Sequence, residues 1–233
     1  MKIGMVGGIG PESTVDYYQR IIRQYRQTMD NDGYPEIIVN SINMTGMLEY
    51  VARQDWDGLT RLLTDAVRAL HAAGADFAFI ASNTPHVIFS RVLKACGIPL
   101  VSIVEAACSE AAILGLKKVG LLGTRFTMQS RYYQDEFDKA GISVVVPDDE
   151  EQRYIEQKLF SEIEHGVFLD DTRQGLLGIV RRMLDDERID GIVLGCTELP
   201  LILTRDEFGI PFLNTTGIHV DRILEYYQQI GVR

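Results

Sequence analysis

Cysteine is scarce in this sequence: among 233 residues it occurs at positions 96, 108 and 196. The three form no CxxC pair and no His/Cys spacing typical of zinc ligands, which argues against a disulfide framework and against a metal site. So few thiols are typical of proteins from a reducing compartment, and we expect a cytoplasmic protein.

Long apolar runs and an excess of positive charge are also missing. No apolar run approaches the about 20 residues that span a bilayer. The glycine-broken segment MKIGMVGGIGPEST indicates a buried strand rather than a signal peptide. The formal net charge is −10, whereas nucleic acids and anionic membranes attract basic surfaces. We therefore expect neither as a partner, while a locally positive site for a small anion stays possible.

What is present is an alternation of strand-like and helix-like segments along the whole chain. The strand-like segments are 2–8, 36–42, 76–81, 99–104, 117–124, 143–147, 190–195 and 211–214. The helix-like segments are 11–29, 56–74, 85–96, 105–116, 149–165, 171–186 and 217–230. Alternation of this kind predicts an α/β fold with parallel sheets covered on both faces.

Two segments occur twice. KIGMVGG from Lys2 matches KVGLLGT from Lys118 at an offset of 116, and DFAFIAS from Asp76 matches DGIVLGC from Asp190 at an offset of 114. Two colinear matches at nearly half the chain length predict two similar α/β lobes. We expect the first lobe to comprise residues 1–100 plus 208–233, since the last strand and helix could return to it. The second lobe would comprise 101–207.

Polar residues follow the two matched strands, in SNTPH and in GCTELP. Ligands bind beyond the carboxyl ends of parallel strands, so Ser82 and Cys196 are candidate site residues. If the lobes face each other, the two side chains lie on opposite walls of one cleft. A thiol before a helix start is expected to have a lowered pKa, which would suit a base or nucleophile. The alternative for Cys196 is a small buried residue at a tight turn. Cys96 and Cys108 are expected to be structural.

The loops after the first strand of each lobe read GGIGPEST and GTRFTM. Such loops bring backbone N–H groups to an anion, and we expect them to hold carboxylates. The first loop does not fit a dinucleotide fingerprint, because its third glycine position is Ser13, and there is no Walker motif.

In this order, GGIGPEST, SNTPH, GTRFTM, GCTELP and NTTGIHV resemble the cofactor-independent aspartate/glutamate racemase family of the Asp/Glu/hydantoin racemase superfamily. The resemblance implies two Rossmann-like lobes with parallel sheets, related by a pseudo-two-fold axis, and an active site in the cleft between them. It also implies amino-acid racemisation without pyridoxal phosphate, metal or nucleotide, and a homodimer.

The family mechanism removes a proton from one face of the α-carbon and returns one to the other face. Two cysteines do this in most members. The second maps onto Cys196 and the first onto Ser82, as in a branch of the family with a hydroxyl residue there. The resemblance further implies that the substrate is held by Asn83, Thr84, Thr124, Thr127 and Thr197. Glu198 and His219 are expected either to tune the thiol or to be satisfied at the interface between the lobes.

The side chain of the substrate stays open. Typical aspartate racemases hold it with an arginine after the second strand and a lysine in the second lobe; here the first region lacks a cation and Glu164 takes the place of the lysine. Arg125, His165 or uncharged donors would substitute, or the substrate is larger or neutral. Two alternatives to a racemase remain: a one-base lyase or isomerase, decarboxylase-like, and a catalytically weak amino-acid-binding homologue.

Overall fold

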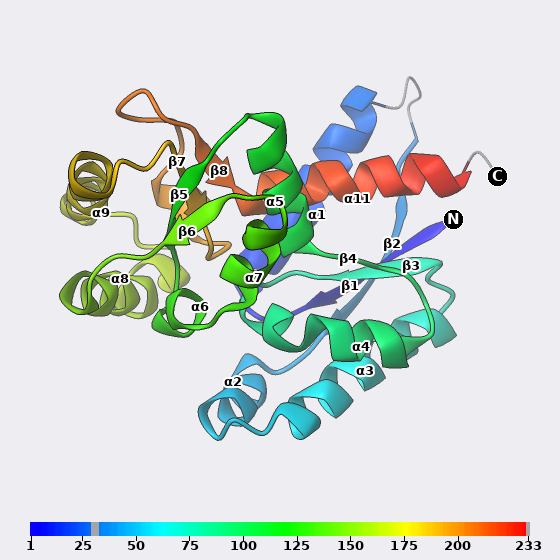
Figure 1. Cartoon of the computed structure of the whole chain (residues 1–233). Helices are drawn as coiled ribbons and strands as arrows, with labels where there is room; N and C mark the ends of the chain where they lie inside the picture. Colours follow the sequence, from blue (N-terminus) through cyan, green and yellow to red (C-terminus); the bar gives the residue numbers. More distant parts are fainter. Residues whose placement is uncertain (29–32, 232–233) are drawn as a thin grey trace. The chain divides into compact units, whose positions relative to one another are not determined.

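The computed structural model describes residues 1–28 and 33–231, which divide into two compact units. Unit 1 is Met1–Ile103 with His219–Arg233, and unit 2 is Val104–Ile218. Each unit has one four-stranded parallel sheet with helices packed on it, so the predicted α/β fold is confirmed (Figure 1).

Unit 1 contains β1 (Lys2–Gly7), β2 (Glu36–Ser41), β3 (Phe77–Ile80) and β4 (Leu100–Val101) in the order β2-β1-β3-β4, all parallel. Its helices are α1 (Pro11–Thr28), α2 (Met44–Ala52), α3 (Trp56–Ala72), the 3-10 turn η1 (Thr84–Ile88), α4 (Phe89–Cys96) and the greater part of α11 (Thr215–Gly231). The predicted helix end at Met29 lies outside the described residues. Helix α2 was not predicted.

The core of unit 1 lies on both faces of its sheet. On one face, α1 and α11 bury an apolar cluster against β1 and β3 that includes Ile3, Met5, Tyr17, Phe79 and Val220. On the other face, a Cβ on Gly4 would lie 3.2 Å from Cβ of Leu70, so α3 packs there directly on the backbone of β1. Figure 1 shows α3 and α4 on the side of this sheet opposite α11.

Unit 2 contains β5 (Lys118–Leu122), β6 (Ser143–Val145), β7 (Gly191–Leu194) and β8 (Phe212–Asn214), again all parallel, in the order β6-β5-β7-β8. Its helices are α5 (Ile103–Ile113), α6 (Arg125–Gln129), α7 (Tyr132–Lys139), α8 (Asp149–Ser161), η2 (Ile163–His165), α9 (Asp170–Arg182), the π-helical turn η3 (Met183–Glu187) and α10 (Leu199–Ile202). The two sheets therefore have the same strand order.

Residues 208–218 differ from the expectation. We expected them in the first lobe, but β8 pairs with β7, with Ile192 opposite Phe212 and Leu194 opposite Asn214. The hydroxyl of Thr215 also donates to the carbonyl oxygen of Leu194, at 2.7 Å. These bonds hold the segment in the second sheet, so the chain returns to unit 1 only at His219, within α11.

The repeat in the sequence is also a repeat of hydrogen bonds. In unit 1 the carboxylate of Asp76 accepts from the backbone N–H of Lys2 at 2.6 Å, and the N–H of Asp76 donates to the Lys2 carbonyl at 3.0 Å. In unit 2 the carboxylate of Asp190 accepts from the N–H of Lys118 at 3.0 Å, and the N–H of Asp190 donates to the Lys118 carbonyl at 2.8 Å. The same aspartate thus fixes the start of the first strand in both units.

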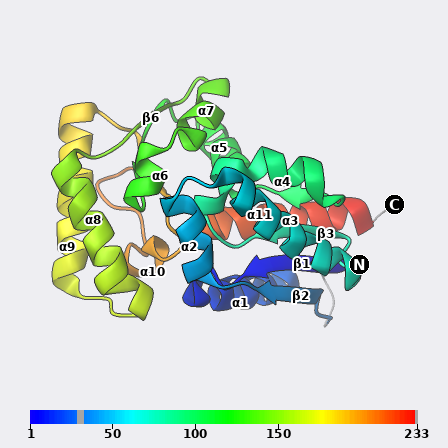
Figure 2. The same ribbon diagram turned by 90° about the horizontal axis from the view of Figure 1, so that it is seen from below.

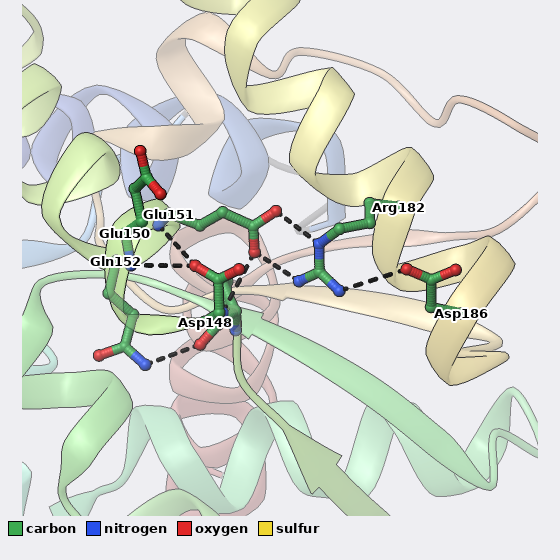
Figure 3. Close-up of polar contacts among 7 residues, drawn as sticks. Asp148, Glu150, Glu151, Gln152, Arg182 and Asp186 are labelled. Carbon is green, nitrogen blue, oxygen red and sulfur yellow. Dashed lines mark hydrogen bonds and ion pairs between the residues drawn. The ribbon is translucent and has the colours of Figure 1, made fainter.

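Helices α8 and α9 lie side by side in unit 2 (Figure 2). Asp148 caps α8 by accepting from the N–H groups of Glu150 and Glu151, each at 2.9 Å, and the Glu151 carboxylate accepts from the N–H of Asp148 at 3.1 Å. Glu151 also binds Arg182 of α9, with Nε to Oε1 at 2.5 Å, and Arg182 reaches Asp186 (Figure 3). This network joins the start of α8 to the end of α9, the two helices that precede and follow η2.

All three cysteines are free and buried. In the described ranges, 1–28 and 33–231, no helix is both long and apolar enough to cross a bilayer, and no group of three or more His, Cys, Asp or Glu residues could hold a metal ion.

Candidate active site

Each sheet has one position where the chain reverses its direction of travel across the strands. From β1 the chain moves outward to β2 and then crosses to β3 on the other side of β1, and β5, β6 and β7 repeat this path. Ligands of parallel α/β sheets bind beyond the carboxyl ends of the strands at such a switch point. Ser82 follows β3 and Cys196 follows β7, so each predicted residue lies at the switch point of its own sheet.

Glycines let the switch point of unit 2 close tightly. A Cβ on Gly195 would lie 2.6 Å from Cδ1 of Leu121 and 2.9 Å from the carbonyl oxygen of Leu122, and a Cβ on Gly123 would lie 3.0 Å from the carbonyl oxygen of Gly195. No side chain fits at either position, because the loops after β5 and β7 touch through their backbones. This contact brings the segment that begins at Thr124 next to the segment that begins at Cys196.

The Cys196 thiol lies in a hydrogen-bonded group with the two residues that follow it. Its Sγ donates to Oε2 of Glu198 at 3.0 Å, and Oγ1 of Thr197 donates to the same oxygen at 2.9 Å. All three residues are buried. The arrangement gives one carboxylate oxygen two donors, and it joins an acid/base pair, thiol and carboxylate, by a direct hydrogen bond.

The electrostatic expectation for the thiol was wrong. Burial, followed by the negative charge of Glu198 and the hydrogen bond to it, raises the pKa of Cys196 well above its ordinary value, whereas a lowered value was expected. Helix α10 begins at Leu199 and has four residues, so it offers only a short helix dipole. The desolvation of a buried thiolate and a neighbouring carboxylate outweigh it.

Across the β5 loop, Thr124 and Thr127 form a hydroxyl cluster with Tyr132. Thr124 caps α6: its Oγ1 accepts from the N–H of Thr127 at 3.3 Å and donates to Oγ1 of Thr127 at 3.1 Å. The phenol of Tyr132 donates to the same Thr127 oxygen at 3.1 Å. A Cβ on Gly195 would lie 3.4 Å from Cγ2 of Thr127, so this cluster lies beside the segment that leads to Cys196. Burial raises the pKa of Tyr132, and the charge of a Cys196 thiolate raises it further.

Tyr132 was not among the site residues predicted from the sequence. The neighbouring Tyr133 is fully buried. The signal in the sequence was its short distance from GTRFTM, since Tyr132 follows Thr127 by five residues and reaches it from the start of α7.

Glu164 adds a second carboxylate to this group. It lies on η2, which packs against α10. Burial and the charge of Glu198 raise the pKa of Glu164 to about 7, and the charge of Glu164 in turn raises the pKa of Cys196. Unit 2 therefore brings together the thiol, two carboxylates and three hydroxyl groups, those of Thr124, Thr127 and Tyr132.

In unit 1, Ser82, Asn83 and Thr84 come one residue after the end of β3. Ser82 and Asn83 are buried, and Thr84 begins η1. His86, two residues on, stacks on Phe89 with ring centroids 4.9 Å apart, and its Nε2 accepts from the N–H of Ile103 at 3.4 Å. Burial lowers the pKa of His86 to about 4, so the ring is neutral and its role is structural.

Some backbone groups of the glycine loop after β1 are hydrogen-bonded to other parts of unit 1. The N–H of Gly8 donates to Oγ1 of Thr14 at 2.8 Å, and the carbonyl of Gly7 accepts from the N–H of Ile42 at 2.9 Å. Gly8 has φ +80°, and a Cβ there would lie 2.3 Å from the carbonyl oxygen of Ile42. These glycines therefore satisfy a tight turn against the segment after β2.

His219 is engaged inside unit 1. Its Nδ1 hydrogen-bonds the phenol of Tyr17 at 2.8 Å, and its Nε2 lies 3.1 Å from the carbonyl oxygen of Val101. With Nε2–H donating to the carbonyl, Nδ1 accepts from the phenol, and the ring is neutral. Burial, and the charge that His86 would carry, lower the pKa of His219 to about 3. Of the two residues expected to tune the thiol, Glu198 contacts it, whereas the hydrogen bonds of His219 join α11 to α1 and β4.

Comparisons with known proteins point in one direction. Residues 6–223 match the family model described as Asp/Glu/Hydantoin racemase. The broad specificity amino-acid racemase RacX of Bacillus subtilis is 27% identical over 220 residues, 92% of this chain and 93% of that protein. The crystal structure of an aspartate racemase homologue from Pyrococcus horikoshii is 34% identical with a TM-score of 0.84, over 97% of this chain and 99% of that one. An aspartate racemase structure from Picrophilus torridus, 18% identical with a TM-score of 0.79 over 97% and 94% of the two chains, shares the fold.

Proposed function

Because the chain belongs to the Asp/Glu/hydantoin racemase family, we propose that it inverts the α-carbon of an amino acid by proton exchange with Cys196 and Ser82. As a member of this family the chain is an isomerase. The observation that carries the residue assignment is that both side chains follow the third strand of their sheets, at equivalent switch points. Removal of a proton from one face and return to the other requires one group on each side of the carbon.

This assignment requires the two units to close on one substrate, related by a pseudo-two-fold axis, with the amino acid in the cleft between them. The shared strand order and the repeated aspartate at Asp76 and Asp190 support it, since they indicate two copies of one ancestral unit. The proposed axis would have to pass near the carboxyl ends of both sheets for Ser82 and Cys196 to face each other. The proposal needs no cofactor, because both proton-transfer groups come from the chain.

Cys196 must lose its proton before it can accept one from carbon. The hydrogen bond from Sγ to Oε2 of Glu198 gives that proton a path at 3.0 Å, and the resulting thiolate removes the α-proton. The α-ammonium group of the substrate offsets the negative charge of the thiol and carboxylate pair. On the opposite face, Ser82 relays a proton to the carbanion and regains one from water.

The remaining predicted residues would hold the substrate in place. In the proposal, their side chains bind its α-carboxylate and amino groups. They are Asn83, Thr84, Thr124, Thr127 and Thr197. Support comes from Thr124 and Thr127, which form one hydroxyl cluster with Tyr132 near the thiol, and from Thr197, which shares the Glu198 oxygen with Cys196.

A one-base lyase and a non-catalytic binding protein are not favoured, because the relatives that match over most of their length are named as racemases.

We further propose a cytoplasmic homodimer. Three free cysteines fit a reducing compartment. The family resemblance indicates the dimer, and exposed apolar side chains such as Ile113, at 78% exposure, offer surface for it. Light scattering at several concentrations tests it; a monomer throughout would contradict it.

The function is tested by incubating the purified protein, with no added cofactor, with each of a panel of L-amino acids in D2O. Proton NMR follows exchange of the α-proton, and chiral chromatography follows inversion. We expect at least one amino acid to exchange and to appear as its D-enantiomer, with loss of both processes in Cys196→Ala. Absence of exchange across the whole panel would contradict the proposal.

A further inference from the structure

The part of the proposed site that unit 2 supplies is acidic. Glu198 follows the thiol by two residues and binds it, and Glu164 approaches from a separate segment, η2, which packs against α10. The two carboxylates and the thiol interact electrostatically with one another. The site thus places two carboxyl groups on one side of the reacting group, and that of Glu164 is an anion above about pH 7.

Neither carboxylate is neutralised by the protein. Within residues 1–28 and 33–231, no Lys, Arg or His nitrogen lies within ion-pair distance of Glu164 or Glu198, whereas Glu151, Glu162 and Glu207 of the same unit are each paired with a lysine or an arginine. Glu162, two residues before Glu164, is one of these, and it pairs with Lys158 at 2.5 Å. A buried carboxylate without a cation is costly, and a cation supplied by a ligand relieves that cost.

The two carboxylates differ in what they can bind. Oε2 of Glu198 already accepts from Cys196 and Thr197, so this residue belongs to the reacting centre. Glu164 comes from another part of the chain, is half-buried, and makes no hydrogen bond through its carboxylate among the described residues. The carboxylate of Glu164 is therefore available to bind a part of the substrate other than the groups around the α-carbon.

We propose that Glu164 is a specificity-determining residue that favours amino acids with a cationic side chain, such as lysine or ornithine, over those with a carboxylate. The inference rests on the proposed function, because Cys196 marks where the α-carbon lies. A side-chain ammonium would pair with Glu164 in a partly desolvated site, whereas a side-chain carboxylate would meet two like charges. The acidic part of the site thus opposes aspartate and glutamate.

The experiment compares substrates of matched shape. Values of kcat/KM for α-proton exchange in D2O are measured for lysine, its uncharged counterpart norleucine, and glutamate. For the wild-type protein we expect lysine to exceed both. In Glu164→Gln the ratio of lysine to norleucine should fall about tenfold or more, since a hydrogen bond to a charged group contributes roughly 1.5–3 kcal/mol. In Glu164→Lys, glutamate should exceed lysine.

A control removes the same charge elsewhere in unit 2. Asp186→Asn changes an exposed carboxylate on η3, and the ratio of lysine to norleucine should stay at the wild-type value. An equal loss for all substrates in Glu164→Gln would contradict the proposal, since it would place Glu164 at the α-ammonium group. A wild-type kcat/KM that is higher for glutamate than for lysine would also contradict it, and this measurement does not depend on the folding of a variant. Exchange with no amino acid would instead contradict the proposed function.

Discussion

Sγ of Cys196 lies 3.0 Å from Oε2 of Glu198 and donates a hydrogen bond to it. Because both groups are buried, the contact stabilises the protonated thiol and raises its pKa. The resting state is therefore a thiol, and the thiolate needed for chemistry forms only when the proton moves or when a cation enters. The protonation state of Cys196 therefore depends on whether a cationic group of the substrate is bound.

Glu198→Gln should lower the pKa of Cys196. The substitution removes the negative charge that raises this pKa and supplies an amide N–H that can donate to the thiolate. Thiolate absorbance near 240 nm, followed against pH and corrected with Cys196→Ala, measures the change. The same correction removes the signal of Cys96 and Cys108. A thiol pKa equal to or above that of the wild-type protein would show that Glu198 does not control it.

The free energy of unfolding should depend on pH because of Glu164. Burial raises the pKa of this carboxyl to about 7, above its value of about 4.3 in an unfolded chain. Between these two pH values the unfolded chain has lost the proton and the folded chain keeps it. The contribution of Glu164 to stability is therefore present at low pH and is lost as pH rises towards 7.

Glu164→Gln removes this loss. We expect the melting temperature of the variant minus that of the wild-type protein to increase from about pH 4.5 to about pH 7 and to level off above that pH. Differential scanning calorimetry in matched buffers measures it, with Asp186→Asn as the control that lacks the trend. A pH-independent difference between the variant and the wild-type protein would contradict the raised pKa.

Much of this organisation could be predicted from the sequence. The repeat at Lys2 and Lys118 and at Asp76 and Asp190 predicts two equal sheets, because the same residues make the same hydrogen bonds in each. The prediction that failed was the assignment of residues 208–218 to the first lobe. The strand at Phe212–Asn214 reads equally well as an edge of either sheet, and only its pairing with β7 decides between them.

The electrostatics could not be predicted in the same way. The pKa of Cys196 depends on burial and on Glu164, a residue 32 positions away that η2 brings to α10. Likewise, the motif that contains His219 indicates a site residue, yet its ring nitrogens bind Tyr17 and Val101, which are distant in the sequence. Such effects arise from tertiary packing, which neither periodicity nor spacing records.

Tyr17→Phe should destabilise the fold. It removes the phenol that hydrogen-bonds Nδ1 of His219 in a fully buried setting, and a buried polar group left without its partner costs about 1–3 kcal/mol. Urea denaturation followed by circular dichroism measures the free energy of unfolding. Tyr18→Phe is the matched control, since Tyr18 is 49% exposed, and it should change stability little. Equal effects of the two substitutions would argue against a structural role for the contact.

The most direct test of the account uses Ser82→Ala in D2O with each enantiomer of the best substrate. If Cys196 and Ser82 act on opposite faces, the variant keeps one base. It should exchange the α-proton of one enantiomer with retained configuration, leave the other enantiomer unexchanged, and racemise at least about 100-fold more slowly than the wild-type protein. Exchange of both enantiomers with racemisation near the wild-type rate would contradict the account, because it would show that the hydroxyl of Ser82 takes no part in inversion.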